Sequence, residues 1–248
     1  MIFTIRTGLG FLRSLVVYRL NIVGQFRQRR LYRQFVRPGD VVFDVGAHVG
    51  GRVWAFRALN CPVVAVEPQQ AFFQFLRLLY GHTKNVVLER CALGAEAGAG
   101  EMLISRQNPT LSSLSSEWVE STGDVKGFRH VSWDNRQQVS IETLDALIIL
   151  HGVPSFCKID VEGYEQDVLR GLTQSIPALS FEFLAAQREL AANCVDQIAR
   201  LGNYTFNISY GETSALMLPT WCSAQEILDR LEKLPMHVSS GDIYARVS

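Results

Sequence analysis

Short apolar runs alternate with helix-patterned segments along the first half of the chain, and turn residues separate them. Valine-rich runs of four or five residues are typical of buried strands, whereas apolar side chains at helical spacing predict amphipathic helices. The predicted strands are residues 41–43, 62–66 and 86–90, and the predicted helices between them are 53–59 and 72–80. An order of strand, helix, strand, helix, strand predicts a parallel sheet covered by helices.

The same alternation returns in the second half of the chain. We expect strands at residues 138–141, 155–160, 178–183, 204–210 and 242–247, and helices after Thr143, at 161–172, at 185–201 and after the capping box of Ser223 and Glu226. The whole pattern predicts an α/β fold with a doubly wound, mostly parallel sheet, to which the final pair of strands adds an antiparallel edge.

Residues 106–137 interrupt this rhythm. The segment is rich in serine, glycine and other polar residues, and residues 94–100 before it also have the composition of a turn. Trp118 and Trp133 lie within the segment, where they can either stack on a sugar face or serve as local plugs. We expect a loop or substrate lid.

The overall composition is that of a folded protein, but the charge is unevenly distributed. The 248 residues are 48% hydrophobic and 19% charged, with no net charge. Residues 1–40 contain eight arginines and a single acid, Asp40. We expect residues 1–36 to form a basic amphipathic helical extension to a domain of residues 37–248. The extension either packs on that domain or contacts an anionic surface, such as a membrane or a polyanionic substrate.

Cysteine usage and the arginines of the extension bear on location. The five cysteines are odd in number and widely spaced, which favours reduced, buried thiols over disulfides or a zinc site. Arginines interrupt the apolar N-terminal stretch before it reaches membrane-spanning length. We therefore expect a cytoplasmic protein, either free or peripheral on the inner face of the membrane. The sequence does not indicate an oligomeric state.

Three predicted strands end in turns that carry acids, and ligands of open parallel sheets bind beyond such strand ends. Asp44 precedes the turn bracketed by Gly46 and Gly50, and these glycines leave room for a ligand against the backbone. Glu67 follows the second strand, where an acid can accept hydrogen bonds from two ribose hydroxyls. The third turn carries Asp160.

The glycine spacing distinguishes between two nucleoside cofactors. The turn reads G-x-x-x-G and lacks the Gly-x-Gly start that brings a pyrophosphate onto a helix N-terminus. Asp44 directly before the turn would repel a pyrophosphate but could help to hold a cationic cofactor or its amino group. Both features favour S-adenosylmethionine over a nicotinamide dinucleotide.

Several stretches, in this order and spacing, resemble the FkbM-type S-adenosylmethionine-dependent methyltransferases. They are VVFDVGAHVGG, AVEPQ, VVLERCALG, SIETLDAL and FCKIDVEGYEQDVLRGL, and the resemblance runs from about residue 37 to 183. KIDVEGYE is far more specific than the glycine turn. The resemblance implies a Rossmann-like class I methyltransferase fold, S-adenosylmethionine as cofactor, and methylation of hydroxyl oxygens of sugars and natural products.

The resemblance also assigns roles to individual residues. It places seven residues at the cofactor: Asp44, Gly46, Ala47, Gly50, Glu67, Cys91 and Ala92. It places three at the reaction end: Lys158, Asp160 and Glu162. Cys91 and Ala92 would lie beside the adenine. No cluster in the sequence has metal-ligand spacing, although the last two carboxylates could bind magnesium, and we expect no metal.

An acceptor hydroxyl must lose its proton, which a nearby carboxylate or histidine can take. Asp160 is the first candidate, followed by Glu162 and His130, and Glu182 is a further acid expected to face inward or toward the pocket. Structural roles stay open for two groups. Asp44 and Glu67 can cap helices, and Lys158 can form a buried ion pair with the aspartate two residues on.

These observations predict an O-methyltransferase acting on a glycan or a secondary metabolite. A methyltransferase for RNA or protein is an alternative, but RNA binding needs basic residues around the pocket, and here the arginines gather in one terminal segment, so we expect no nucleic-acid partner. The pattern of strands and helices is also compatible with a non-catalytic cofactor-binding protein or a nicotinamide-dependent oxidoreductase, because a fold does not fix a function.

Overall fold

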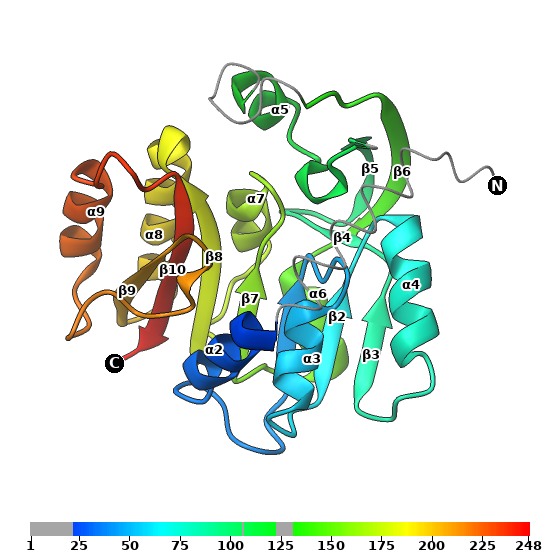
Figure 1. Ribbon diagram of the computed structural model, residues 1–248, viewed down its shortest axis with the longest axis horizontal. Helices are drawn as coiled ribbons and strands as arrows, with labels where there is room; N and C mark the ends of the chain where they lie inside the picture. Colours follow the sequence, from blue (N-terminus) through cyan, green and yellow to red (C-terminus); the bar gives the residue numbers. More distant parts are fainter. Residues whose placement is uncertain (1–21, 106, 123–130) are drawn as a thin grey trace.

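The computed structural model describes residues 22–105, 107–122 and 131–248, in which a seven-stranded sheet forms the centre (Figure 1). In spatial order its strands are β3 (Val86–Glu89), β2 (Val63–Val66), β1 (Val42–Val45), β7 (Phe156–Ile159), β8 (Ala178–Leu184), β10 (Ser240–Val247) and β9 (Tyr204–Tyr210). The chain order reverses between β1 and β7, because β2 and β3 extend the sheet to one side of β1 and β7 to β10 extend it to the other.

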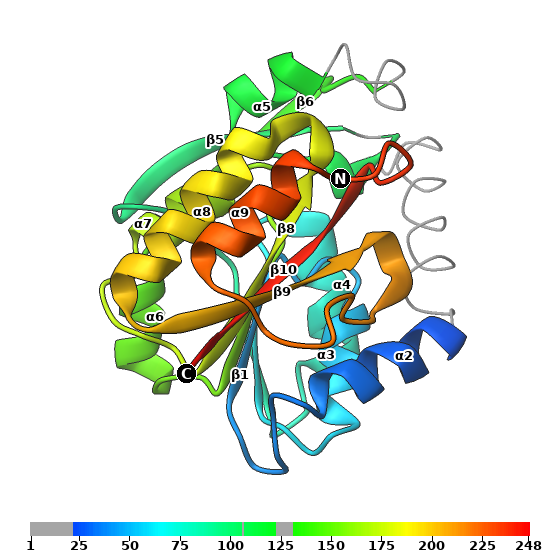
Figure 2. The same cartoon turned by 90° about the vertical axis from the view of Figure 1, so that its left-hand side faces the viewer.

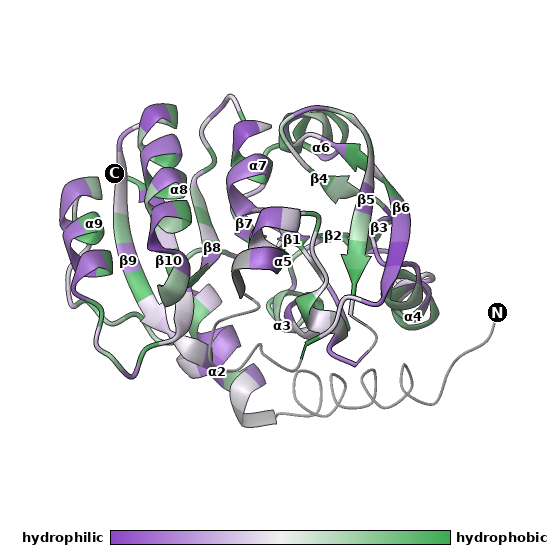
Figure 3. Cartoon of the chain, turned by 90° about the horizontal axis from the view of Figure 1, so that it is seen from above, coloured by the Kyte–Doolittle hydropathy of each residue, from purple (hydrophilic) through white to green (hydrophobic). Residues whose placement is uncertain are grey.

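Helices cover both faces of this sheet, which confirms the doubly wound α/β prediction (Figures 1 and 2). One face packs on α2 (Ile22–Tyr32), α3 (Gly51–Arg57) and α4 (Gln70–Tyr80); the other packs on α6 (Leu144–His151), α7 (Glu165–Arg170), α8 (Arg188–Leu201) and α9 (Ala224–Glu232). Successive side chains of a strand point to opposite faces, so Val42 joins the first core and Phe43 the second. In Figure 3, α8 and α9 change from hydrophilic to hydrophobic around their circumference, as expected for helices that pack on one side.

The antiparallel pairing predicted near the end of the chain is present. The antiparallel strand, β10, is the second strand from the edge of the sheet, whereas we expected it at the edge. β10 pairs antiparallel with β8 on one side and with β9 on the other. β9 therefore forms the edge and runs parallel to β8, and the antiparallel strand is the second from that edge.

A smaller sheet lies above the carboxyl ends of the main strands and was not predicted (Figure 1). It contains β4 (Ala92–Leu93), β6 (Asn135–Glu142) and β5 (Gly98–Ile104), with β5 and β6 antiparallel. The prediction of a turn at residues 94–100 is thus wrong for 98–100, which begin β5. The described part of the predicted loop, 106–137, contains the short helix η2 (Pro109–Leu111) and α5 (Ser116–Thr122).

The described part of the basic N-terminal extension packs on the domain. Leu31 and Tyr32 of α2 are buried, and the Tyr32 ring lies 4.3 Å from that of Phe56 in α3. Residues 1–21 lie outside the described residues, so the boundary at residue 36 and a contact of the extension with a membrane stay predictions. Across the described ranges, no helix is both long enough and apolar enough to cross a bilayer. The five cysteines are buried and free, as expected.

Candidate functional site

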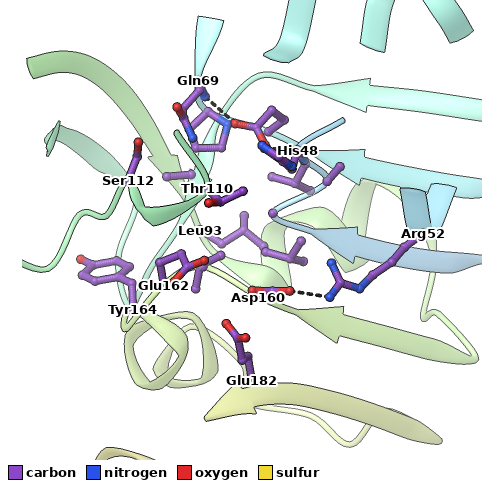
Figure 4. Close-up of a pocket in the computed structure, with 18 of the residues that line it drawn as sticks. His48, Arg52, Gln69, Leu93, Thr110, Ser112, Asp160, Glu162, Tyr164 and Glu182 are labelled. Carbon is purple, nitrogen blue, oxygen red and sulfur yellow. Dashed lines mark hydrogen bonds and ion pairs between the residues drawn. The ribbon is translucent and has the colours of Figure 1, made fainter. Parts of the chain in front are cut away.

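A pocket lies at the switch point of the sheet, beyond the carboxyl ends of β1, β2 and β7 (Figure 4). Parallel strands of an α/β sheet end at one edge, so the turns that follow them meet there. The pocket is lined by the turn after β1 (residues 45–49), the turn after β2 (66–69), residues 91–93, the turn after β7 (160–162) and part of the segment above the sheet (110, 112 and 114). The acid-bearing turns predicted from the sequence therefore come together.

Glu67 is held rigidly at one end of this pocket. The backbone N–H groups of His48 and Gln69 donate to its two carboxylate oxygens, each at 2.8 Å. Each oxygen retains a lone pair for a ligand, as two ribose hydroxyls would require. Burial raises the pKa of Glu67 to about 7, although the two N–H donors favour the charged form. Cys91 and Ala92 also line the pocket, and burial raises the pKa of the Cys91 thiol to about 12, so this thiol stays neutral.

The two turn glycines serve different contacts. Gly46 has φ +84°, and a Cβ atom there would lie 1.9 Å from the carbonyl oxygen of Asp160, so the β1 turn can approach β7 only with glycine. A Cβ on Gly50, which has φ +74°, would lie 2.8 Å from Leu76 of α4. Gly46 and Ala47 line the pocket, but Gly50 does not. Gly50 allows close packing of the turn on α4, and its expected role at the cofactor stays a prediction.

Asp44 lies behind the pocket lining rather than in it. Its side chain is 1% exposed, and neither carboxylate oxygen accepts a hydrogen bond of good geometry within the described part of the chain. Burial raises the pKa of Asp44 to about 6, while the positive charge of Arg52 opposes this rise. An orphaned carboxylate next to the pocket floor fits a cationic ligand, and this property supports the expectation of S-adenosylmethionine.

Three carboxyl groups cluster at the other end of the pocket. Oxygens of Asp160, Glu162 and Glu182 all lie within 4.8 Å of one another, and Figure 4 shows the side chains of Asp160 and Glu182 pointing toward each other. Nη2 of Arg52 is 2.6 Å from Oδ2 of Asp160, and Nζ of Lys158 is 3.7 Å from the same oxygen. Burial alone would raise the pKa of Asp160, but the two cations outweigh it and hold that pKa well below its usual range.

The two glutamates of this cluster behave in the opposite way. Burial, followed by the negative charge of Asp160, raises the pKa of Glu162 and of Glu182 well above the usual range. The cluster thus favours the ionised form of Asp160 and the protonated forms of the two glutamates, an arrangement suited to moving a proton. Three close carboxyl oxygens also resemble a magnesium site, but Arg52 and Lys158 already supply positive charge here. Independence of a metal stays a prediction.

Lys158 lies beneath the cluster and does not reach the pocket. Its side chain is fully buried, and Nζ donates to Oδ1 of Asp242 at 2.7 Å and to the carbonyl oxygen of Ile159 at 3.1 Å. Burial would lower its pKa, but Asp242 and Asp160 raise it above the usual value. The ion pair with Asp160 that the sequence left open is present at 3.7 Å, but Asp242 is the nearer partner. The catalytic role expected of Lys158 stays a prediction, and its contacts in the structure are with Asp242 and Asp160.

Glu162 sits in a turn where the sequence predicted a helix. Residues 161–164 precede α7, and both Glu162 (φ +54°) and Gly163 (φ +86°) have left-handed backbone conformations. The Glu165 carboxylate accepts hydrogen bonds from the N–H groups of Val161 (3.0 Å) and Gly163 (3.3 Å). A non-glycine residue in this conformation costs about 1–3 kcal/mol and persists only where its surroundings hold it.

The segment above the sheet provides part of this hold. Ser113 Oγ donates to the carbonyl oxygen of Glu162 at 2.6 Å, and the indole of Trp118 packs so closely that a Cβ on Gly163 would lie 1.9 Å from it. Trp118 is buried, and its ring meets that of Trp133 edge-on at 6.2 Å. This geometry supports a local plug, rather than a stacking surface for a sugar, as the role of Trp118.

Some residues of the site were not predicted, and one predicted candidate cannot be placed. Arg52, Gln28, Tyr164 and Glu212 line the pocket. Arg52 left a signal in the sequence, because a cation in the first turn of a helix opposes the helix dipole and so implies an acidic partner. Gln28 and Glu212 had no signal. His130 lies outside the described residues, so its proposed role stays a prediction.

An α/β sheet with a pocket at its switch point, an acid after β2 and a carboxyl cluster after β7 is typical of enzymes that bind nucleoside cofactors. The sequence model of the methyltransferase FkbM domain matches residues 44–209. The chain therefore belongs to the methyltransferase FkbM domain family.

Two characterised relatives match part of the chain. The chain is 25% identical over 154 residues to the hexuronic acid methyltransferase AglP of Haloferax volcanii, with 61% of this chain and 58% of that protein covered. It is 31% identical over 160 residues to the 31-O-demethyl-FK506 methyltransferase FkbM of Streptomyces tacrolimicus, with 55% and 61% covered. The match thus spans about three fifths of each relative's length.

Among solved structures, a TehB-like SAM-dependent methyltransferase from Corynebacterium glutamicum superposes with a TM-score of 0.46 at 8% identity, covering 96% of this chain and 94% of that one.

Proposed function

We propose that the protein is an S-adenosylmethionine-dependent O-methyltransferase that acts on a hydroxyl of a glycan or a secondary metabolite. The observation that carries the proposal is that one pocket combines two features. Glu67 at one end is placed to accept hydrogen bonds from two ribose hydroxyls, and the cluster of three carboxyl groups at the other end is suited to moving a proton. The relatives are named for methylation of a hexuronic acid and of 31-O-demethyl-FK506, and both names support a small-molecule or glycan acceptor.

Residues at the first end of the pocket would hold the cofactor. Glu67 would accept hydrogen bonds from the ribose hydroxyls, and Cys91 and Ala92 would form the apolar wall beside the adenine. Asp44 would attract the positive charge from behind the turn. When bound, S-adenosylmethionine supplies an activated methyl group for attack by an oxygen nucleophile.

Residues at the second end would handle the proton of the acceptor. Asp160 is the ionised member of the cluster and can accept a proton, and Glu182 and Glu162 lie close enough to share it. Arg52 and Lys158 would fix the position and charge of Asp160. Alignment of the acceptor oxygen is worth at most about 7–11 kcal/mol and would be the larger contribution, because the methyl group needs little further activation.

Two measurements test this proposal. Calorimetric titration with S-adenosylhomocysteine should show binding in the micromolar range, and absence of binding by the wild-type protein would overturn the proposal. Transfer of labelled methyl groups from S-adenosylmethionine to pooled acceptors should label hydroxylated sugars or metabolites. Labelling of only RNA or protein would instead indicate a macromolecular acceptor, and cofactor binding without transfer to any pool would indicate a non-catalytic protein.

A further inference from the structure

A second hollow lies on the other side of α2 from the cofactor pocket. It runs between α2 and the segment that follows β9, and Figure 2 shows these two elements side by side. Arg27, Arg30 and Gln34 line one wall. The facing wall combines hydroxyls with apolar side chains, among them Thr213, Ser214, Leu216, Leu218 and Trp221.

The arginines in this groove are not neutralised. Neither Arg27 nor Arg30 forms an ion pair with any residue in the described ranges, and residues 1–39 of the sequence contain no acid. The facing segment, residues 213–221, carries no charge. Two guanidinium groups offer planar donors that match phosphate oxygens, and their two positive charges equal the charge of a phosphate dianion.

The groove adjoins the cofactor pocket at two places along the chain. Gln28 of α2 and Glu212 of η4 (Gly211–Thr213) line the pocket, whereas their chain neighbours Arg27 and Thr213 line the groove. Adjacent residues of the same two elements thus line both hollows, which places the groove within reach of a molecule that extends out of the pocket. Gln28 Oε1 is buried at this boundary and accepts no hydrogen bond from a described residue.

We propose that the groove binds a phosphate group of the acceptor, with an apolar part of the same molecule against Leu216, Leu218 and Trp221. This inference rests on the proposed function, because only a methyltransferase has a methyl acceptor. It deepens that function by narrowing the acceptor to phosphate-bearing molecules. Apart from Asn207, the groove residues lie outside residues 44–209, the range that matches the family model. The groove is therefore formed mainly by parts of the chain beyond that range.

The test compares one double variant with a matched control from the same part of the chain. Arg27→Ala combined with Arg30→Ala removes both groove cations. Arg33→Ala removes an exposed arginine of the segment just after α2 that lines neither the groove nor the pocket. The probes are inorganic pyrophosphate, followed by calorimetry, and vesicles of phosphatidylcholine with and without phosphatidic acid, followed by sedimentation.

We expect the wild-type protein to bind at least one phosphate probe, the double variant to bind it at least tenfold more weakly, and Arg33→Ala to differ from wild type by less than twofold. Binding of pyrophosphate indicates a soluble phosphate ligand, and binding of only the phosphatidic acid vesicles indicates a lipid phosphate. Equal losses in the control and the double variant would indicate diffuse charge attraction and overturn the proposal. Failure of the wild-type protein to bind either probe would also overturn it.

Titration with S-adenosylhomocysteine separates this inference from the proposed function. All three proteins should bind S-adenosylhomocysteine with the same affinity, because the substituted arginines do not line the cofactor pocket. Loss of phosphate binding with unchanged cofactor binding supports the groove. Absence of cofactor binding in the wild-type protein counts against the proposed function and leaves the phosphate measurement interpretable.

Discussion

Arg52 and Asp160 join the start of α3 to the end of β7 through an ion pair of 2.6 Å at the floor of the pocket. Both side chains are largely buried, with 21% and 14% of their surface exposed. The pair therefore acts in a less polar medium than a surface pair, and each ion strongly biases the protonation of its partner. Lys158 and Arg52 lower the pKa of Asp160 against the effect of burial and so favour its ionised form.

Replacing Arg52 with methionine should raise the pKa of Asp160, because one of the two cations that lower it is lost. A base is effective only above its pKa, so the acid limb of the kcat/KM profile should move to higher pH. The measurement is the pH dependence of methyl transfer. Arg57→Met on the same helix is the control, since Arg57 stacks on Tyr80 outside the pocket. An identical profile in Arg52→Met and wild type would contradict the role assigned to the pair.

Replacing Glu67 with glutamine should weaken binding of S-adenosylhomocysteine. The amide retains the shape of the carboxylate but replaces one acceptor oxygen with an NH₂ donor. This NH₂ group would face the N–H of His48 or Gln69, and the one remaining oxygen cannot accept from both N–H groups and from a ribose. We expect a loss of about 1–3 kcal/mol of binding free energy, measured by calorimetry. Glu101→Gln, at an exposed ion pair on β5, should bind like wild type. Unchanged affinity in Glu67→Gln would contradict the role of Glu67 as the acceptor for the ribose hydroxyls.

Replacing Asp44 with asparagine should increase stability more at high pH than at low pH. The pKa of Asp44 is raised from 3.8 to about 6 in the folded protein, so folding favours its protonated form and stability falls as pH rises from about 4 to about 6. The uncharged variant avoids this loss. We expect its advantage over wild type in urea unfolding to grow by about 1 kcal/mol between pH 5 and pH 8. A constant difference would mean that Asp44 is already compensated in the folded state.

Replacing Gly163 with alanine should disturb the Glu162 turn by displacing Trp118. Gly152→Ala is the control, because Gly152 has nearly the same positive φ, +85°, and open space around it. Each substitution should cost about 1–3 kcal/mol of stability from backbone strain. Only Gly163→Ala should shift tryptophan emission to longer wavelength and lower kcat while retaining S-adenosylhomocysteine binding. Equal emission spectra in the two variants would contradict the packing of Trp118 on this turn.

The main sheet was predictable because each strand and helix carries its own local pattern. The valine-rich β1 and β2 and the Ser223–Glu226 capping box are local signals, and the structure contains all three. β5 was missed because Gly98 and Gly100 give its start the composition of a turn, and only pairing with β6 makes it a strand. The start of α7 was misplaced because the Glu162–Gly163 conformation depends on contacts with residues some fifty positions away.

The sequence predicted those residues of the candidate site that lie at the ends of strands. Glu67, Asp160 and Glu162 could be expected at the pocket because each lies at the end of a predicted strand or just after it. The depth of each residue could not be expected, since burial depends on packing between elements. Asp44 and Lys158 therefore lie behind the lining, and Gln28 and Glu212 enter it from parts of the chain without a local signal.

The placement of β10 between β8 and β9 has a consequence for how the protein folds during synthesis. β10 emerges after β9 but must insert beside β8 before β9 can join the sheet. It also carries Asp242, the partner of Lys158 at 2.7 Å. Until β10 is in place, the ammonium group of Lys158 on β7 lacks this counter-ion. We therefore expect β7 and β8 to remain partly hydrated at that stage. The end of the pocket that holds the carboxyl cluster should then dry and become ordered late, after β10 has joined the sheet.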